Sequence, residues 1–302
     1  MRLDGVLFFP VTPFGPDGEV AEEPLIQHVD QGVSAGAGGV FAACGTGEFN
    51  ALDLDDYTKV VAASVTATAG RVPVFAGAGG SLPFAKAVAR AAASSGADGL
   101  LLMPPYLVTA PAEGLIQYVR EVADAAGLPV IVYHRGNARF TPDSTAALAR
   151  MPDVIGLKDG LGDFDLLQRI ILTVRQQAPG SEFTFFNGLP TAELTVPAFR
   201  GMGVNLYSSA AFAFAPEVAL AFHQAVTSGD DALAQRLLTS FYLPLVQLRD
   251  QVPGYAVSLV KAGLRLRGQD VGGVRPPLVD PSAEHVAELE KIIAAGLEIV
   301  GA

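Results

Sequence analysis

The feature that most constrains the fold is a regular alternation of short apolar runs with longer segments of helical composition. Runs rich in Val, Phe, Leu and Ile recur at roughly 20–35 residue intervals. They cover residues 5–13, 38–45, 72–79, 98–105, 128–134, 153–159, 182–188 and 203–209. Uninterrupted apolar strands separated by helices are typical of a parallel sheet that is buried on both faces. Eight such units predict a closed (β/α)8 TIM barrel rather than an open sheet.

The repeat ends near residue 210, and the rest of the chain shows helical patterns without a further strand signal. These patterns cover residues 216–228, 230–249, 254–267 and 282–299. No flexible linker separates them from the preceding units. We therefore expect a barrel over residues 1–212 and a C-terminal helical extension over 213–302 that packs on it.

The composition excludes several classes of protein. The chain is 50% hydrophobic and 17% charged, which is typical of a compact globule, and its net charge of −11 argues against a nucleic-acid or anionic-membrane surface. A single cysteine, Cys44, excludes an internal disulfide and indicates a reducing compartment. The N-terminus does not look like a signal peptide, and no stretch reaches about 18 uninterrupted apolar residues. Four scattered histidines show no metal-ligand spacing. We expect a cytoplasmic protein with no nucleic-acid or membrane partner and no metal.

One lysine stands out because it lies at the end of an apolar strand. Lys158 ends the run "DVIGLKD", whereas the other four lysines lie in helical, polar-flanked segments. In a barrel of this type the active site lies at the C-terminal ends of the strands. Burial lowers the pKa of a lysine, so the neutral amine can attack a carbonyl and form a Schiff base. The alternative is a structural lysine that pairs with Asp159 or Glu48, or that extends its amine to solvent. Strand position alone leaves both open.

A tyrosine ends the neighbouring strand. Tyr133 and Lys158 follow consecutive strands, so their side chains could share one site. A phenol beside an amine can transfer protons while a carbinolamine forms and collapses. Taken alone, Tyr133 could equally be an aromatic residue that hydrogen-bonds a loop.

A glycine-rich turn follows the second strand. The backbone N–H groups of Gly45 and Gly47, together with the hydroxyl of Thr46, could hold a carboxylate. The alternative is a tight turn in which Thr46 and Glu48 cap the next helix.

Taken together, these motifs resemble a known superfamily. "GVLFFPVTPF", "GTGE", "PPY", "VIVYHRGNA" and "IGLKDG", in this order and spacing, are similar to the dihydrodipicolinate synthase/N-acetylneuraminate lyase superfamily of class I Schiff-base barrels. The resemblance implies that Lys158 forms the imine without a separate cofactor and that Tyr133 is the acid/base tyrosine. It implies that Thr46 and the nearby backbone clamp an α-keto carboxylate. Tyr106 matches a tyrosine that reaches into a neighbouring subunit's site, in homotetramers built as dimers of dimers.

Two departures indicate a branch of this superfamily. Residues 44–48 read Cys-Gly-Thr-Gly-Glu, without the first threonine of the usual Gly-Thr-Thr-Gly-Glu, and residues 134–138 read His-Arg-Gly-Asn-Ala instead of Asn-x-Pro. These features resemble 5-dehydro-4-deoxyglucarate dehydratase. That resemblance implies a small keto-deoxy sugar diacid as substrate, which is dehydrated and decarboxylated to 2,5-dioxopentanoate. The alternatives are an aldol cleavage or condensation on the same imine, or a non-catalytic keto-acid binding protein.

A diacid also needs a partner for its far carboxylate. Arg135 is the candidate, because a guanidinium binds carboxylates through two parallel hydrogen bonds; the alternative is a surface ion pair. Ser208, Ser209 and Asn187 end the last two strands. They could hydrogen-bond the sugar hydroxyls or simply satisfy the backbone at the strand ends.

Overall fold

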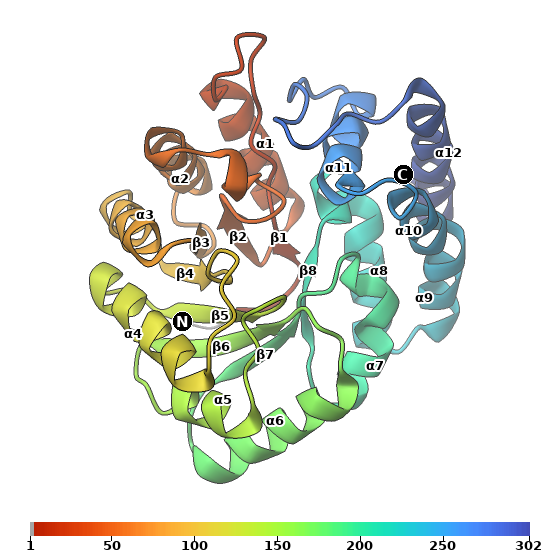
Figure 1. Ribbon diagram of the computed structural model, residues 1–302. Coiled ribbons are helices and arrows are strands. Elements are labelled where there is room, and N and C mark those ends of the chain that lie inside the picture. Colours follow the sequence, from red (N-terminus) through yellow and green to blue (C-terminus); the bar gives the residue numbers. More distant parts are fainter. Residues whose placement is uncertain (1–2) are drawn as a thin grey trace.

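Eight parallel strands close into a barrel in the order β1 to β8 (Figure 1). This computed structural model describes residues 3–302. The strands are β1 (Leu7–Phe8), β2 (Gly39–Ala42), β3 (Val74–Ala78), β4 (Gly99–Leu102), β5 (Val130–His134), β6 (Val154–Asp159), β7 (Thr184–Asn187) and β8 (Leu206–Ser209). Each lies within one of the eight apolar runs, so the predicted barrel is confirmed.

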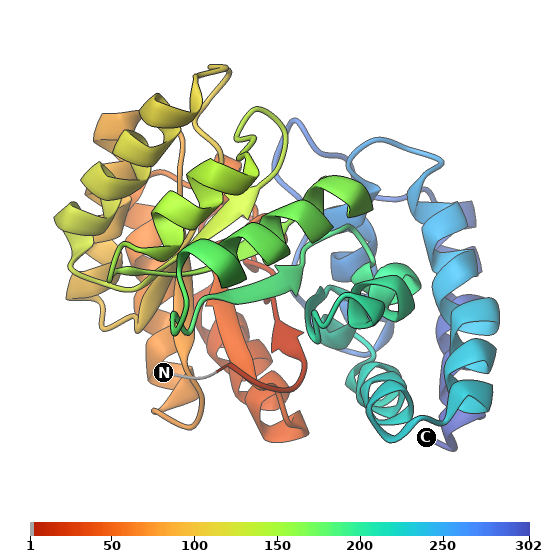
Figure 2. The same ribbon diagram turned by 90° about the horizontal axis from the view of Figure 1, so that it is seen from below.

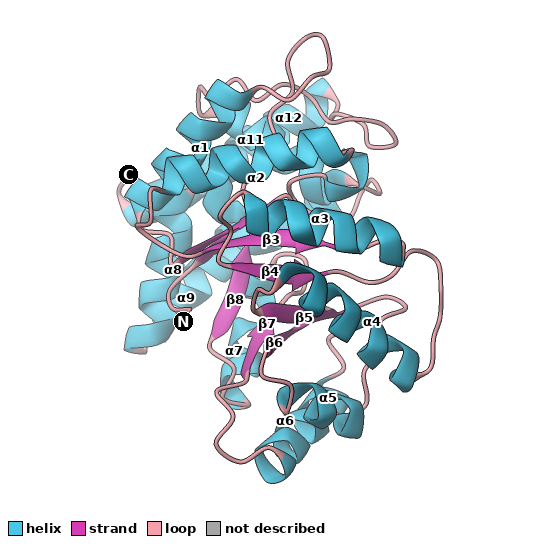
Figure 3. Ribbon diagram, turned by 90° about the vertical axis from the view of Figure 1, so that its left-hand side faces the viewer, coloured by secondary structure: helices cyan, strands magenta, loops and turns pink. Residues whose placement is uncertain are grey.

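A helix follows every strand and covers the outside of the barrel (Figure 3). The helices are α1 (Glu22–Ala35), α2 (Leu54–Thr68), α3 (Leu82–Ser94), α4 (Ala112–Ala126), α5 (Pro142–Ala149), α6 (Phe164–Gln177), α7 (Val196–Gly201) and α8 (Pro216–Ser228). Asp53, Thr141 and Asp163 cap α2, α5 and α6, because each side chain accepts a hydrogen bond from a backbone N–H of the first turn. Helix α8 contacts α1, which closes the ring.

The C-terminal helices gather on one side of the barrel (Figures 1 and 2). They are α9 (Asp231–Leu237), α10 (Leu243–Arg249), α11 (Tyr255–Leu266) and α12 (Ala283–Val300). A π-helical turn over Leu238–Tyr242 joins α9 to α10, which accounts for the continuous helical pattern of residues 230–249. The division at residue 212 stays a prediction. Within the described residues, no helix has the length and apolar character needed to cross a membrane.

The barrel interior is filled by aromatic and aliphatic side chains. The ring of Phe41 stacks between those of Phe9 and Phe75, at centroid distances of 4.6 and 5.1 Å. The barrel is therefore a packed core rather than a pore. Strand pairing sets Tyr133 of β5 directly beside Lys158 of β6, near the C-terminal ends of both strands. The sheet register thus brings together the two residues that the sequence singled out.

Candidate active site

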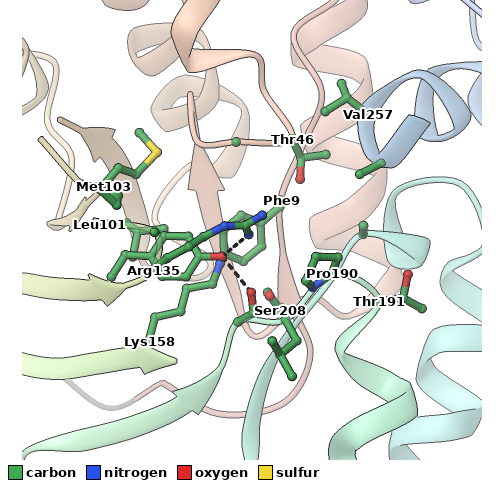
Figure 4. A pocket seen from close by; sticks show the side chains of 18 of the residues that line it. Phe9, Thr46, Leu101, Met103, Arg135, Lys158, Pro190, Thr191, Ser208 and Val257 are labelled. Atoms are coloured by element: carbon green, nitrogen blue, oxygen red, sulfur yellow. Dashed lines mark hydrogen bonds between the residues drawn. The ribbon is translucent and has the colours of Figure 1, made fainter. Parts of the chain in front are cut away.

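A cavity of about 470 Å³ opens at the C-terminal ends of the strands (Figure 4). Its lining consists of Phe9, Gly45, Thr46, Leu101, Met103, Pro104, Tyr133, Arg135, Gly136, Lys158, Gly188, Leu189, Pro190, Thr191, Ser208, Ala210, Arg249, Ala256 and Val257. The side chains of Lys158 and Arg135 converge beside Phe9, while Thr46 and Ser208 border the same space. Most strands and two C-terminal helices therefore contribute to one site.

Lys158 lies at the bottom of the cavity among aromatic rings. It is only 4% exposed, and its Nζ lies 4.0 Å from the centroid of the Phe9 ring, 4.6 Å from that of Tyr133 and 5.7 Å from that of Phe186. The pKa of Lys158 is lowered from 10.5 to about 7, mainly because the amine is buried; Cys44 opposes this shift, and the charge of Arg135 contributes to it. A large share of this amine is therefore neutral and nucleophilic near pH 7.

Neither structural partner that the sequence left open for Lys158 binds it. Among residues 3–302, Lys158 forms no salt bridge. Glu48 instead pairs with Lys261 at 2.6 Å, and both side chains are fully buried. Asp159 accepts a hydrogen bond from the backbone N–H of Gly162 at 3.0 Å. Lys261 lies in a helix, as predicted for the lysines other than Lys158, but it is buried as well, and the Glu48 carboxylate compensates its charge inside the protein.

The hydroxyl of Tyr133 is held from two sides. It donates a hydrogen bond to the carbonyl oxygen of Gly188 and accepts one from Nη1 of Arg135, both at 2.7 Å. Burial raises the pKa of Tyr133, and both the charge and the hydrogen bond of Arg135 oppose that shift. The phenol can thus exchange protons with a group bound over Lys158.

Two glycines leave the space that these side chains fill. A Cβ on Gly188 would lie 2.4 Å from Cγ of Lys158, and a Cβ on Gly160 would lie 2.6 Å from Cε2 of Tyr133. Real Cβ atoms are not found at such distances. Glycine is therefore required at both strand ends for Lys158 and Tyr133 to occupy the cavity.

The turn after β2 offers unpaired backbone donors. Ala43 and Glu48 adopt positive φ angles of 49° and 57°, which curls the chain between them. Within the described residues, the amides of Gly45 and Thr46 donate to no backbone carbonyl, whereas the carbonyl of Gly45 accepts from Glu48 at 3.2 Å. Such a curl of free N–H groups suits an anion. Gly47 does not line the cavity, and its carbonyl accepts a hydrogen bond from the Thr12 hydroxyl at 2.7 Å.

The remaining candidates divide into two groups. Arg135 and Ser208 line the cavity. The amide of Asn187 instead donates to the Ala192 carbonyl at 3.0 Å, and the Ser209 hydroxyl donates to Glu193 at 2.5 Å. The Ser209 hydroxyl also accepts a hydrogen bond from the backbone N–H of Phe212 at 3.1 Å, so both residues contact backbone groups near the strand ends, which is the alternative stated above.

Tyr106 lies outside the cavity lining and is 71% exposed in the loop between β4 and α4. Its predicted place in a neighbouring subunit's site stays a prediction.

A second arginine lines the cavity, and no sequence motif indicated it. Arg249 ends α10, is mostly buried, and donates a hydrogen bond to the Thr191 hydroxyl at 2.8 Å. Its own neighbour Asp250 pairs with it at 2.7 Å. The segment between β7 and α7 also lines the cavity, through residues 188–191. A helical pattern carries no mark that its last residue faces a distant strand end, so no local signal could have found Arg249.

The charge of the cavity opposes that of the whole chain. Its described lining holds the cationic or basic side chains of Lys158, Arg135 and Arg249 and no Asp, Glu, His or Cys. Elsewhere in residues 3–302, too, no three such metal-ligating side chains cluster closely enough to hold a metal ion. This lining is suited to an anionic small molecule, with Tyr133 and Lys158 available for proton transfer.

Comparisons with curated relatives cover almost the whole chain. A protein of Streptomyces griseus subsp. griseus named "Probable 5-dehydro-4-deoxyglucarate dehydratase" is 60% identical over 292 residues, which are 97% of this chain and 91% of the relative. A protein of Paracidovorax citrulli with the same name is 42% identical and covers 96% of this chain and 94% of its own.

Solved structures share the fold. Dihydrodipicolinate synthase from Bacillus clausii is 24% identical with a TM-score of 0.88, and each chain covers 97% of the other. YagE from E. coli K12, in complex with pyruvate, is 26% identical with a TM-score of 0.85, and each chain covers 98% of the other. The model of the dihydrodipicolinate synthetase family matches residues 2–296. The chain belongs to the dihydrodipicolinate synthetase family.

Proposed function

We propose that this protein is a Schiff-base lyase that converts 5-dehydro-4-deoxy-D-glucarate to 2,5-dioxopentanoate, CO2 and water. The observation that carries the proposal is the Lys158 amine, which is buried, has no carboxylate partner among residues 3–302 and lies over the ring of Tyr133. The names of relatives that are 57–60% identical support the choice of substrate. No cofactor is needed, because the imine on Lys158 supplies the electron sink.

The cavity provides for both carboxylates of the substrate. The carboxylate next to the ketone would accept hydrogen bonds from the Gly45 and Thr46 amides and the Thr46 hydroxyl, which places the ketone carbon toward Lys158. The distal carboxylate would lie against the guanidinium of Arg135, with Arg249 as a second cation in the same cavity. Ser208 is available to hydrogen-bond a hydroxyl between the two ends.

The reaction then follows from the imine. Lys158 attacks the ketone at carbon 5, and one water leaves as the protonated imine forms. Loss of a proton from carbon 4 gives an enamine, which expels the hydroxyl of carbon 3 as water. The bond from carbon 2 to the distal carboxyl breaks next, CO2 leaves, and the electron pair moves into the conjugated imine. Protonation at carbon 4, hydrolysis of the imine and ketonisation of the enol at carbon 2 release the product.

Proton transfers in this sequence need an acid that also serves as a base. The described cavity lining has no carboxylic acid or imidazole, so Tyr133 is the group that can protonate both departing oxygens. The Tyr133 ring lies beside the Lys158 amine, with 4.6 Å between Nζ of Lys158 and the ring centroid. Tyr133 would therefore act at the imine and at the leaving hydroxyl.

We further propose a cytoplasmic homotetramer built as a dimer of dimers. Tyr106, Leu107 and Val108 are 71%, 83% and 57% exposed and form one apolar loop tip. Asn137, which follows β5, braces this loop by donating to the carbonyl of Pro105 at 2.9 Å. A braced apolar tip supports a subunit contact. Sedimentation velocity of the wild type and of Tyr106→Ser would test it, and a monomeric wild type would refute it.

The activity is tested by trapping and by product analysis. Borohydride added during turnover should reduce the imine, and mass spectrometry should place the adduct on Lys158. Lys158→Met should give no adduct, whereas Lys291→Met, which replaces an exposed lysine of α12, should react like the wild type. Release of CO2 with a semialdehyde product supports the dehydratase. Pyruvate as the product, or its consumption, would instead identify the aldol alternative on the same imine.

A further inference from the structure

Tyr133 has two hydrogen-bond partners for its hydroxyl, and they come from different strand ends. Nη1 of Arg135 donates to it at 2.7 Å, and the carbonyl of Gly188 accepts from it at 2.7 Å. A phenol oxygen fixed between one donor and one acceptor has little freedom to rotate its proton. The position of the Tyr133 hydroxyl oxygen in the cavity is therefore set by Arg135 and Gly188 together.

Arg135 reaches this position because of the turn after β5. It follows Tyr133 by two residues, so both side chains start from the same face of the chain. Gly136, at a φ of 58°, begins a turn that a bridge between Arg135 and Ala138 closes. The guanidinium then folds back over the cavity, with its central carbon 5.6 Å from the centroid of the Tyr133 ring.

The other ionisable groups near Tyr133 do not replace this contact. The Lys158 amine faces the ring rather than hydrogen-bonding the hydroxyl. Asp159 and Cys44 both raise the pKa of Tyr133, and the pKa of Cys44 is itself raised to about 12 by burial. Within the described residues, Arg135 is thus the permanently charged group that hydrogen-bonds the phenol and favours its ionised form.

We propose that Arg135 is a positioning residue for Tyr133: its guanidinium holds the phenol oxygen in place in the cavity and stabilises the phenolate whenever the proton has been given away. This inference rests on the proposed function, since it names the group that supports the proton transfers of that reaction. It leaves the other N–H groups of Arg135 available for the distal carboxylate.

The role of Arg135 is clearest at the step in which the carbinolamine loses water to form the imine. The C–O bond breaks, its electron pair leaves with the oxygen, and that oxygen takes the proton of Tyr133 and departs as water. The nitrogen lone pair of Lys158 forms the C=N bond, so a protonated imine and a phenolate result. The phenolate then removes a proton from carbon 4 and becomes a hydroxyl again. In each cycle the negative charge lies on the oxygen to which Arg135 donates.

Pyruvate separates this role from binding of the distal carboxylate. It has a ketone beside one carboxylate and no second carboxylate, so a residue that only binds the distal end does not touch it. The experiment compares wild type, Arg135→Gln and Arg135→Lys, with borohydride quenching and intact mass as the measure of imine formation between pH 6 and 10. Arg135 is exposed at the cavity mouth, so these variants should fold, which circular dichroism checks.

The expected result is slower imine formation with pyruvate in the Arg135 variants. Arg135→Gln should slow it by about tenfold at pH 7 and move the pH limit assigned to Tyr133 upward by about one unit. Arg135→Lys should recover part of the rate because it restores the charge. Tyr133→Phe identifies that limit, since it should remove it.

Two outcomes would overturn the proposal. If Arg135→Gln forms the pyruvate imine at the wild-type rate and with the wild-type pH limits, and only the KM for the diacid rises, Arg135 acts on the distal carboxylate alone. If the wild type forms no imine with pyruvate, the role at imine formation is wrong. A wild type that forms this imine but releases no CO2 from the diacid refutes the proposed function, and the pyruvate rates still decide the role of Arg135.

Discussion

Replacing Lys158 by methionine should abolish activity and yet make the folded protein more stable. The amine is 4% exposed and has no carboxylate partner among the described residues, so folding must either bury a charge or release a proton. The lowered pKa of about 7 expresses this cost. Methionine has a similar length, needs no solvation and packs well against aromatic rings.

The size of the effect follows from the pKa difference between the unfolded and folded states. With 10.5 unfolded and about 7 folded, the cost at pH 7 is about 4 kcal/mol, and at pH 9 it is about 2 kcal/mol. The unfolded chain binds more protons across this range, so wild-type stability rises with pH relative to the variant. Loss of the contacts between the amine and the Phe9 and Tyr133 rings offsets about 1–2 kcal/mol. We therefore expect Lys158→Met to be stabilised by about 2–3 kcal/mol at pH 7.

Urea unfolding at fixed protein concentration measures this difference. The chain has no tryptophan, so far-UV circular dichroism is the suitable signal. Lys291→Met controls for the loss of a lysine at an exposed position and should change stability little at either pH. If the advantage of Lys158→Met over wild type does not shrink between pH 7 and pH 9, the amine is not desolvated and the reasoning fails.

Three further predictions concern the same residues. Gly188→Ala should cost at least about 100-fold in kcat, because the new Cβ would lie 2.4 Å from Cγ of Lys158; steady-state rates check this, and wild-type rates would contradict the packing argument. Imine formation in the wild type should rise with pH through about 7 as Lys158 loses its proton, which a pH series of borohydride trapping measures; a rise centred near 10.5 would contradict it. Lys261→Met should destabilise the fold by about 3–5 kcal/mol, because it leaves Glu48 buried without its partner, and the double variant with Glu48→Gln should recover much of the loss in urea unfolding.

The barrel and the proximity of Lys158 to Tyr133 could be predicted from the sequence because both depend on strand order. Apolar runs mark buried strands, and a barrel brings all their C-terminal ends together. Lys158 and Tyr133 lie at the ends of consecutive runs, so their proximity could be predicted from the sequence alone. Asn187 and Ser209 also end strands, yet their side chains turn into hydrogen bonds outside the cavity. Which strand-end residue faces the cavity depends on register and on the path of the next loop, and neither is visible in one sequence.

Contacts between residues far apart in the sequence are the second kind of feature that could not be predicted from the sequence. Lys261 lies in a helical pattern of ordinary appearance, and nothing local indicates that it pairs with Glu48 across more than 200 residues of chain. The same is true of Arg249, which reaches the cavity from the end of α10. Both contacts exist because the C-terminal helices pack beside the barrel mouth. Residues that act across such an interface can be found only once that packing is known.

The charges in the cavity also explain how the proposed reaction could release its product. The chain has a net charge of −11, but the described lining holds Lys158, Arg135 and Arg249 without a carboxylate. A diacid therefore enters a site whose charge opposes that of the surrounding surface. Decarboxylation removes one of its two negative charges, so the product would keep only the carboxylate that we propose the Gly45 and Thr46 amides bind. The product is therefore attracted less strongly to the arginines than the substrate is, and its affinity falls at the step that removes the second charge.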